Sequence, residues 1–108
     1  MRFTPSPVTG VNSIQGSIIF IDDYKNLITN ITEKMFKDVG VKRSFECKFG
    51  GAKVRKIVTA YSDQIPGEIV VLFNSSGLLE IAMRYGNAAD LLGLKVNDTV
   101  RIDFEEKK

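Results

Sequence analysis

Hydrophobic and polar residues alternate along most of this chain in short runs, and glycines or polar turns separate the runs. Alternation with a period of two is typical of strands that bury one face. The pattern predicts seven strands, over residues 16–21, 26–31, 44–49, 52–60, 69–73, 78–83 and 100–104. Seven short strands with little helix favour an all-β fold, a small and mainly antiparallel β-barrel.

Two short stretches depart from this alternation and predict helices. Thr32 can cap a helix that runs to about Val39, where apolar residues recur at helical spacing. Asn87 can cap a shorter helix over residues 88–92, and Gly93 suits the left-handed position that follows a helix. We therefore expect one or two short helices beside the barrel.

The first 15 residues differ in composition from the rest. Three of the first ten are Pro or Gly, which predicts an extended lead-in over residues 1–15 and a single barrel domain over residues 16–108. No run approaches the roughly 18 apolar residues of a membrane-spanning helix. The first residues also lack the apolar core of a signal peptide, so we expect a cytoplasmic protein.

The chain has no histidine. Ser-His and Cys-His catalysis and most zinc sites need one, so we predict no catalytic residue and no metal. The single cysteine, Cys47, excludes an internal disulfide and fits a reducing compartment. Because it alternates with Phe45 and Phe49, we expect a small core residue rather than a nucleophile.

Two stretches carry a resemblance to a known family. The first is Ile-Asp-Asp-Tyr-Lys-Asn-Leu-Ile-Thr-Asn-Ile over residues 21–31. The second is Asn-Ser-Ser-Gly-Leu-Leu-Glu-Ile-Ala over residues 74–82, followed by Gly-Asn-Ala-Ala at 86–89 and Leu-Leu-Gly-Leu at 91–94. In this order and spacing they resemble the C-terminal domain of the S-adenosyl-L-methionine hydroxide adenosyltransferases, the hydrolytic relatives of the fluorinase and chlorinase enzymes. The resemblance covers residues 16–104.

The resemblance implies a substrate-binding domain rather than a complete enzyme. In the family, the residues that activate water belong to an N-terminal α/β domain, and nothing in this chain matches that domain. The substrate of the parent enzyme would be S-adenosyl-L-methionine, which it would hydrolyse to adenosine and L-methionine. The reaction would need no cofactor. The family assembles as a homotrimer in which one subunit's N-terminal domain faces a neighbour's C-terminal domain. This chain alone is therefore expected to be inactive.

Three residues match family positions that contact the substrate. The resemblance implies that Asp22 pairs with the ammonium of the methionine moiety and that Asn26 reads the adenine edge, where an amide complements N6 and N7. It also implies that Tyr61 stacks on the adenosine, because a flat ring suits a base. From the residues alone, ordinary turn chemistry for Asp22 and Asn26 and a plug at one barrel end for Tyr61 are the alternatives.

The second stretch contributes the other expected contacts. Ser75 matches the serine that binds the methionine carboxylate. Ser76 stands where the halogenating members have an arginine, which favours the hydrolytic branch. Met83 and Tyr85 fall where the family lines the adenine pocket, although Met83 suits core packing equally well. Lys25 replaces a glycine of the family in the first stretch.

Two functions of other classes remain open. The segment from Lys42 to Lys56 has six basic residues and one acidic residue, a local charge of +5, and residues 92–100 resemble the closing hairpin of swapped-hairpin transcription factors. A nucleic-acid-binding barrel is one alternative, although such charge is usually a solvated strand face. A structural oligomerisation module is the other. We expect the turns at 22–26 and 74–77 to meet and to hold the nucleoside and amino-acid ends of the substrate in one site, so their placement tests this expectation.

Overall fold

The structure is a computed structural model that describes residues 7–40, 43–58, 67–83 and 86–105. Tyr61 and Tyr85, both expected at the site, lie outside these residues. Within them the elements are, in order, β1 (Val8–Thr9), β2 (Ser13–Ile21), β3 (Leu27–Thr32), α1 (Glu33–Gly40), β4 (Phe45–Phe49), β5 (Ala52–Val54), β6 (Ile57–Val58), β7 (Ile69–Phe73), β8 (Leu78–Met83), α2 (Ala88–Leu92) and β9 (Thr99–Phe104).

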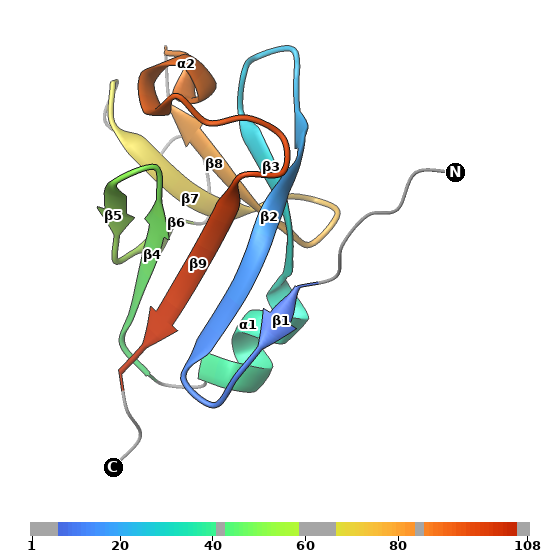
Figure 1. Cartoon of the computed structure of the whole chain (residues 1–108), viewed down its shortest axis with the longest axis vertical. Coiled ribbons are helices and arrows are strands. Elements are labelled where there is room, and N and C mark those ends of the chain that lie inside the picture. The colour runs from blue at the N-terminus through green and yellow to red at the C-terminus, as the bar shows by residue number, and fades with distance from the viewer. Residues whose placement is uncertain (1–6, 41–42, 59–66, 84–85, 106–108) are drawn as a thin grey trace.

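The strands form one nearly closed sheet in the order β5-β4-β9-β2-β3-β8-β7-β6, with β1 beside β2. The described pairs are antiparallel except β6 with β7, which is parallel. β5 and β6 follow each other in sequence yet occupy the two ends of this order, so the sheet curls until its ends approach (Figure 1). The predicted small, mainly antiparallel β-barrel is confirmed.

The strand expected from residue 16 begins earlier, at Ser13. Gly16 does not interrupt it, because the missing side chain makes room for a neighbour: a Cβ there would lie 2.5 Å from Oδ1 of Asn30. β1 pairs with Ile14 and Gln15 of this strand. Part of the expected lead-in therefore belongs to the sheet.

The single strand expected over residues 52–60 is wrong in its extent. It divides into β5 and β6 because their partners lie at opposite ends of the sheet: β5 pairs with β4, and β6 pairs with β7. Arg55 and Lys56 make the crossing, and Glu46 on β4 holds the Arg55 guanidinium at 2.8 Å. This division and the added β1 raise the expected seven strands to nine among the described residues.

Aliphatic side chains from alternate strand positions fill the barrel. The fully buried ones include Ile14, Ile18, Leu27, Ile31, Val71, Leu79, Ile81, Val100 and Ile102. Cys47 is buried among them, and its burial raises the pKa of the thiol to about 12. The prediction of a small core residue at Cys47 is confirmed, because a protonated thiol is a poor nucleophile.

The two helices lie at opposite ends of the barrel (Figure 1). Oγ1 of Thr32 accepts a hydrogen bond from the backbone of the first turn of α1 at 3.1 Å. Oδ1 of Asn87 accepts the N–H of Asp90 at 2.9 Å, and Gly93 follows α2 with a φ of 66°. The predicted caps are confirmed. Neither described helix has the length and apolar character needed to cross a bilayer.

Candidate functional site

The turn between β2 and β3 carries Asp22 and Asn26, and hydrogen bonds organise it from within. Oδ1 of Asp22 accepts the backbone N–H groups of Tyr24 and Asn26, both at 2.9 Å. The N–H of Asp22 donates to the carbonyl of Asn26 at 3.1 Å. Nδ2 of Asn26 lies 3.5 Å from Oδ2 of Asp22, and Asn26 is only 8% exposed. The side chain of Asp22 therefore forms hydrogen bonds within its own turn, and these bonds hold Asp22 and Asn26 next to each other.

Lys25, at the position where the family has a glycine, has a left-handed backbone conformation. Its φ is 64°, in the left-handed region that glycine adopts easily. This region costs a residue with a side chain roughly 1–2 kcal/mol. The hydrogen bond from the N–H of Lys25 to the carbonyl of Asp22, at 2.9 Å, helps to offset that cost.

The first turn of α2 lies against this hairpin. The N–H of Ala89 donates to the carbonyl of Lys25 at 3.1 Å. The first N–H groups of a helix have no acceptor inside the helix, so the hairpin supplies one. The N–H of the buried Leu94 donates back to the carbonyl of Ala89 at 3.2 Å. α2 is therefore anchored both to the hairpin and to the core.

Met83 ends β8 on the side of the barrel that carries α2. β8 runs antiparallel to β3, so it ends where β3 begins, beside Asn26. A Cβ on Gly86 would come within 2.0 Å of Sδ of Met83, so the thioether lies against the Gly86 backbone. Met83 is half-buried, which is compatible with both of its expected roles. We call this region the α2 end: residues 22–26, 83 and 86–92.

The turn between β7 and β8 carries Ser75 and Ser76 at its exposed tip. Oδ1 of Asn74 accepts the N–H of Ser76 at 2.9 Å, so the asparagine side chain builds the turn. The carbonyl of Gly77 accepts the N–H of Glu33 at 2.8 Å, which attaches the turn to the start of α1.

The two turns do not meet. The turn at 22–26 adjoins the start of β3, whereas Leu78, which follows the turn at 74–77, lies opposite Thr32 at the end of β3. β3 has six residues, and a strand of that length is roughly 15–20 Å long. The expectation that the two turns form one compact site is wrong, because strand pairing places them at opposite ends of β3.

Thr29 and Asn30, near the end of the first matching stretch, have structural roles. Oγ1 of Thr29 donates to the carbonyl of Leu79 at 2.9 Å and accepts the N–H of Ile31 at 3.2 Å. Oδ1 of Asn30 accepts the N–H of Ser17 at 2.9 Å. Thr29 bonds β8 where the register between β3 and β8 shifts, and Asn30 bonds the backbone of β2. The barrel therefore explains this part of the motif without a ligand.

Large apolar side chains are exposed at or beside the α2 end, a feature that sequence reasoning missed. Phe20 is 57% exposed, Tyr24 80% and Leu91 62%. Phe20 would point inward if the alternation of Ile14 and Ile18 continued, but the register between β2 and β3 shifts after Ile18. Exposed aromatic and leucine side chains on neighbouring elements are typical of a surface that another protein segment covers.

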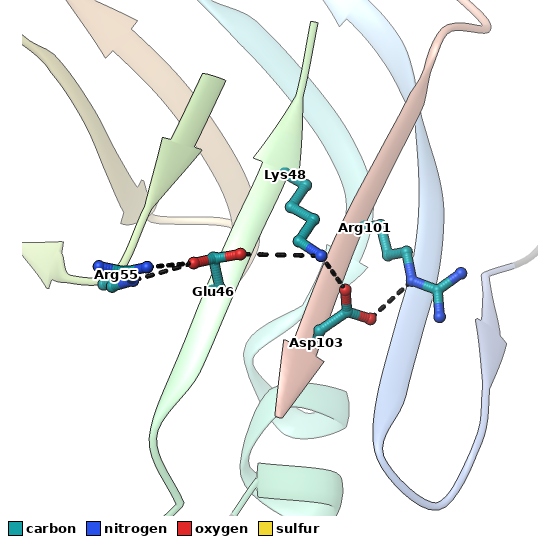
Figure 2. A network of polar contacts seen from close by, with 5 residues as sticks. All are labelled: Glu46, Lys48, Arg55, Arg101 and Asp103. Carbon is teal, nitrogen blue, oxygen red and sulfur yellow. Dashed lines mark hydrogen bonds and ion pairs between the residues drawn. The ribbon is translucent and has the colours of Figure 1, made fainter. Parts of the chain in front are cut away.

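On the flank formed by β4 and β9, basic and acidic side chains alternate in one network (Figure 2). Glu46 pairs with Arg55 at 2.8 Å and with Lys48 at 3.7 Å. Asp103 pairs with Lys48 at 2.8 Å and with Arg101 at 2.6 Å. The Arg55 guanidinium lowers the pKa of the Glu46 carboxyl, and Lys48 and Arg101 lower that of Asp103. The network balances part of the charge of the basic segment.

Arg43, another cation of that segment, is engaged in the fold. Its guanidinium lies 5.6 Å from the ring centroid of Phe104. It also donates at 2.9 Å to three backbone carbonyls, those of Val11, Val39 and Glu105. Three of the six basic residues thus have partners inside the domain: Arg43, Lys48 and Arg55. A solvated strand face explains this charge better than a nucleic-acid surface does.

The part of the chain that the structure describes offers no second candidate site. Within the described ranges, no three His, Cys, Asp or Glu side chains are grouped as a metal site would need. A shallow pocket of about 280 Å³ lies at the β4–β5 turn, lined by Lys48, Phe49, Gly50, Gly51, Ala52, Lys53 and Thr99. It includes none of the residues expected to bind the substrate.

Comparison with known proteins agrees with the matching stretches. Residues 16–101 match the family model described as SAM hydroxide adenosyltransferase C-terminal domain. The chain is similar to an uncharacterized conserved protein from Thermotoga maritima, with a TM-score of 0.78 and 26% identity over 94% of this chain. A conserved hypothetical protein from Thermus thermophilus gives a TM-score of 0.65 and 27% identity over 82% of this chain. A search of curated proteins gave no match.

The chain spans less than half of either solved relative, 40% of the Thermotoga protein and 34% of the Thermus protein. The family match itself extends from β2 into β9 and includes both matching stretches. Because it covers most of the sequence, this chain belongs to the family of SAM hydroxide adenosyltransferase C-terminal domains.

Proposed function

We propose that this chain is the substrate-binding domain of an enzyme that hydrolyses S-adenosyl-L-methionine to adenosine and L-methionine. One structural observation supports the proposal beyond the family match. Asn26 and Met83 both lie at the α2 end, and the resemblance implies that residues at these two positions line the adenine pocket. S-adenosyl-L-methionine is the substrate in this proposal, and the reaction needs no cofactor.

Asn26 is the side chain at the α2 end that suits adenine. Its amide offers a donor and an acceptor, the complement of N7 and the N6 amino group. Asn26 is largely buried in a hydrogen-bonded turn, so little side-chain freedom remains to be lost on binding. Met83 would add an apolar contact, and Tyr61 and Tyr85 would add aromatic and backbone contacts.

Ser75 and Ser76 suit the other end of the ligand. Exposed hydroxyls and backbone N–H groups at a tight turn can bind a carboxylate. Since Ser75 and Asn26 lie at opposite ends of β3, the ligand would extend along β3 and β8, with adenine at Asn26 and the carboxylate at Ser75. The neutral Ser76 is in line with a hydrolytic parent. Asp22 lies at the adenine end, so its expected contact with the ammonium gains no support from this arrangement.

The reaction requires a partner for this domain. Water must be oriented and desolvated to displace methionine from the ribose carbon, and the sulfonium then leaves as a neutral thioether. We assign that task to the N-terminal domain of the parent enzyme, supplied by a neighbouring subunit of a homotrimer in the cytoplasm. The exposed Phe20, Tyr24 and Leu91 are the surface that this domain would cover. The isolated chain would then be inactive.

Isothermal titration calorimetry of the chain with adenosine tests the adenine assignment. Asn26→Ala should weaken the affinity by about tenfold or more, because a bidentate amide contact to adenine is worth roughly 1–3 kcal/mol. Asn12→Ala removes an exposed amide far from the α2 end and is the matched control, with an expected affinity equal to that of the wild type. Equal affinities for all three proteins would remove Asn26 from the site. No binding of adenosine to the wild type at millimolar concentration would contradict the proposed ligand.

A further inference from the structure

We infer that Asp22 is a positioning residue that holds Asn26 and α2 in the relative arrangement that an adenine pocket requires. The inference deepens the proposed function and rests on it for the identity of the ligand. It gives Asp22 a different role from the direct contact with an ammonium that the family resemblance implies.

The carboxylate of Asp22 is occupied by its own turn. Oδ1 accepts two backbone N–H groups at 2.9 Å, and Oδ2 lies 3.5 Å from Nδ2 of Asn26. A carboxylate has about four lone-pair positions, so these three contacts use most of its capacity. Hydrogen bonds to an ionised acceptor are stronger than those between neutral groups. The carboxylate is therefore the group that determines the shape of the turn.

The shape of the turn reaches α2 through Lys25. Residues other than glycine hold a left-handed φ only where their surroundings impose it. Here the two N–H groups bound by Asp22 belong to Tyr24 and Asn26, the residues on either side of Lys25. The carbonyl of Lys25 then accepts the N–H of Ala89 at 3.1 Å. Without the carboxylate, Lys25 would relax to a negative φ and its carbonyl would leave Ala89.

The place of Asp22 in the barrel favours this role over an ammonium contact. Ser75, the expected ligand of the methionine carboxylate, lies in the turn between β7 and β8, beside the other end of β3. The ammonium and the carboxylate of an amino acid are bonded to the same carbon atom. One copy of the domain therefore does not present Asp22 and Ser75 to the same amino-acid group. Asp22 lies beside Asn26 instead, at the adenine end.

Three substitutions separate positioning from charge. Asp22→Ala removes the charge and every side-chain acceptor. Asp22→Asn removes the charge but keeps an oxygen acceptor, since asparagine forms the same kind of turn as aspartate. Asp23→Ala removes an equal charge from the next residue, which is exposed on the same turn, and is the matched electrostatic control.

Amide hydrogen exchange of the ligand-free chain measures the coupling. The Ala89 amide should exchange at least about tenfold faster in Asp22→Ala than in the wild type. In Asp22→Asn and in Asp23→Ala its exchange rate should stay within about twofold of the wild-type rate. Retained protection of core amides such as those of Val71 and Ile81 shows that the barrel is folded. Unchanged exchange at Ala89 in Asp22→Ala would overturn the inference.

A second variant covers the case in which Asp22→Ala does not fold. Ala89→Pro removes the donor of the same link, an N–H of the first turn of α2 that has no acceptor inside the helix. It should weaken adenosine binding by about tenfold if the link positions the pocket. Wild-type affinity in a folded Ala89→Pro chain would also overturn the inference.

Titrations with adenosine and with L-methionine complete the test. Adenosine has no ammonium group, so a positioning role predicts about tenfold weaker adenosine binding for Asp22→Ala and nearly unchanged binding for Asp22→Asn. A role as a ligand charge predicts unchanged adenosine binding and weaker methionine binding in both variants, and that result would overturn the inference. If the wild type binds no adenosine, the proposed ligand fails, whereas exchange at Ala89 still decides whether Asp22 positions α2.

Discussion

The two ends of the barrel are closed in different ways. The α1 end consists of α1 and four aromatic rings, and it is closed by packing. The ring centroid of Phe36 lies 4.9 Å from that of Phe45 and 5.5 Å from those of Phe73 and Phe104. Such edge-on and tilted contacts add to the free energy of burial, so this end stabilises the fold.

The α2 end is closed by directional hydrogen bonds. A chain of contacts runs from the carboxylate of Asp22 through Lys25 to Ala89, and large apolar side chains beside it stay exposed. Hydrogen bonds add little net stability, but they determine geometry. We therefore expect substitutions at the α1 end to change the free energy of unfolding, and substitutions at the α2 end to change local order and binding.

The largest effect is expected for Phe36→Ala. Loss of this ring should lower the free energy of unfolding by about 3 kcal/mol, since a cavity would open among the aromatic side chains. Urea denaturation measures the change, and Lys37→Ala, exposed on the same helix, is the control. Adenosine affinity of the folded protein should not change. A loss below about 1 kcal/mol would mean that the rings repack, and the contrast between the ends would weaken.

Gly40→Ala tests how tightly the α1 end is packed. A Cβ on Gly40 would lie 2.0 Å from Cε1 of Phe104, too close for any unstrained contact. Overpacking of this kind should cost about 2 kcal/mol in the free energy of unfolding. Adding Phe104→Leu to Gly40→Ala should recover part of the loss by making room. Wild-type stability of Gly40→Ala alone would show that the ring moves freely.

At the α2 end, Asn87→Ala should act locally. It removes the side chain that accepts the N–H of Asp90, which is worth about 1 kcal/mol to a helix. Hydrogen exchange should report faster opening of α2, with little change in the urea midpoint. Leu91→Ala, exposed on the same helix, should leave exchange unchanged. If Asn87→Ala lowered the free energy of global unfolding, measured with urea, as much as the free energy of local opening of α2, the two ends of the barrel would unfold together.

Local patterns in the sequence predicted most of the fold. Alternation with a period of two depends on neighbouring residues alone, and it located most of the strands. It also predicted that Cys47 is buried. The helix caps at Thr32 and Asn87 were predictable for the same reason, since a cap bonds an N–H two or three residues away.

What the sequence did not predict depends on pairing between distant residues. The outward turn of Phe20 follows from a register shift between β2 and β3, and the separation of the two turns follows from the pairing of β3 with β8. The family motif predicted which residues to examine but not their distances. The shape around Lys25 could not be predicted from its type, since lysine rarely adopts a positive φ.

Lys25→Gly should stabilise the hairpin slightly. Relief of the left-handed conformation, roughly 1–2 kcal/mol, outweighs the entropy that glycine loses on folding, so the free energy of unfolding should rise by about 0.5 kcal/mol. Lys25→Ala is the control, because it removes the long side chain without relieving the backbone. Equal stabilisation by both variants would attribute the effect to the side chain and not to φ.

Asp103, on β9 beside the α1 end, should give the smallest effect. Lys48 and Arg101 lower its pKa in the folded chain. The ionised carboxylate of Asp103 therefore stabilises the fold at pH values above its pKa in the unfolded chain, about 4. This stabilisation is lost as the pH falls through the lower pKa of the folded chain. Asp103→Asn should lower the free energy of unfolding by a few tenths of a kcal/mol at neutral pH and should not change it near about pH 2. At neutral pH, about 0.5 M salt should reduce the difference in stability between the variant and the wild type. A cost that persists in acid and in salt would mean that Asp103 acts through packing, and this flank would then belong with the apolar α1 end.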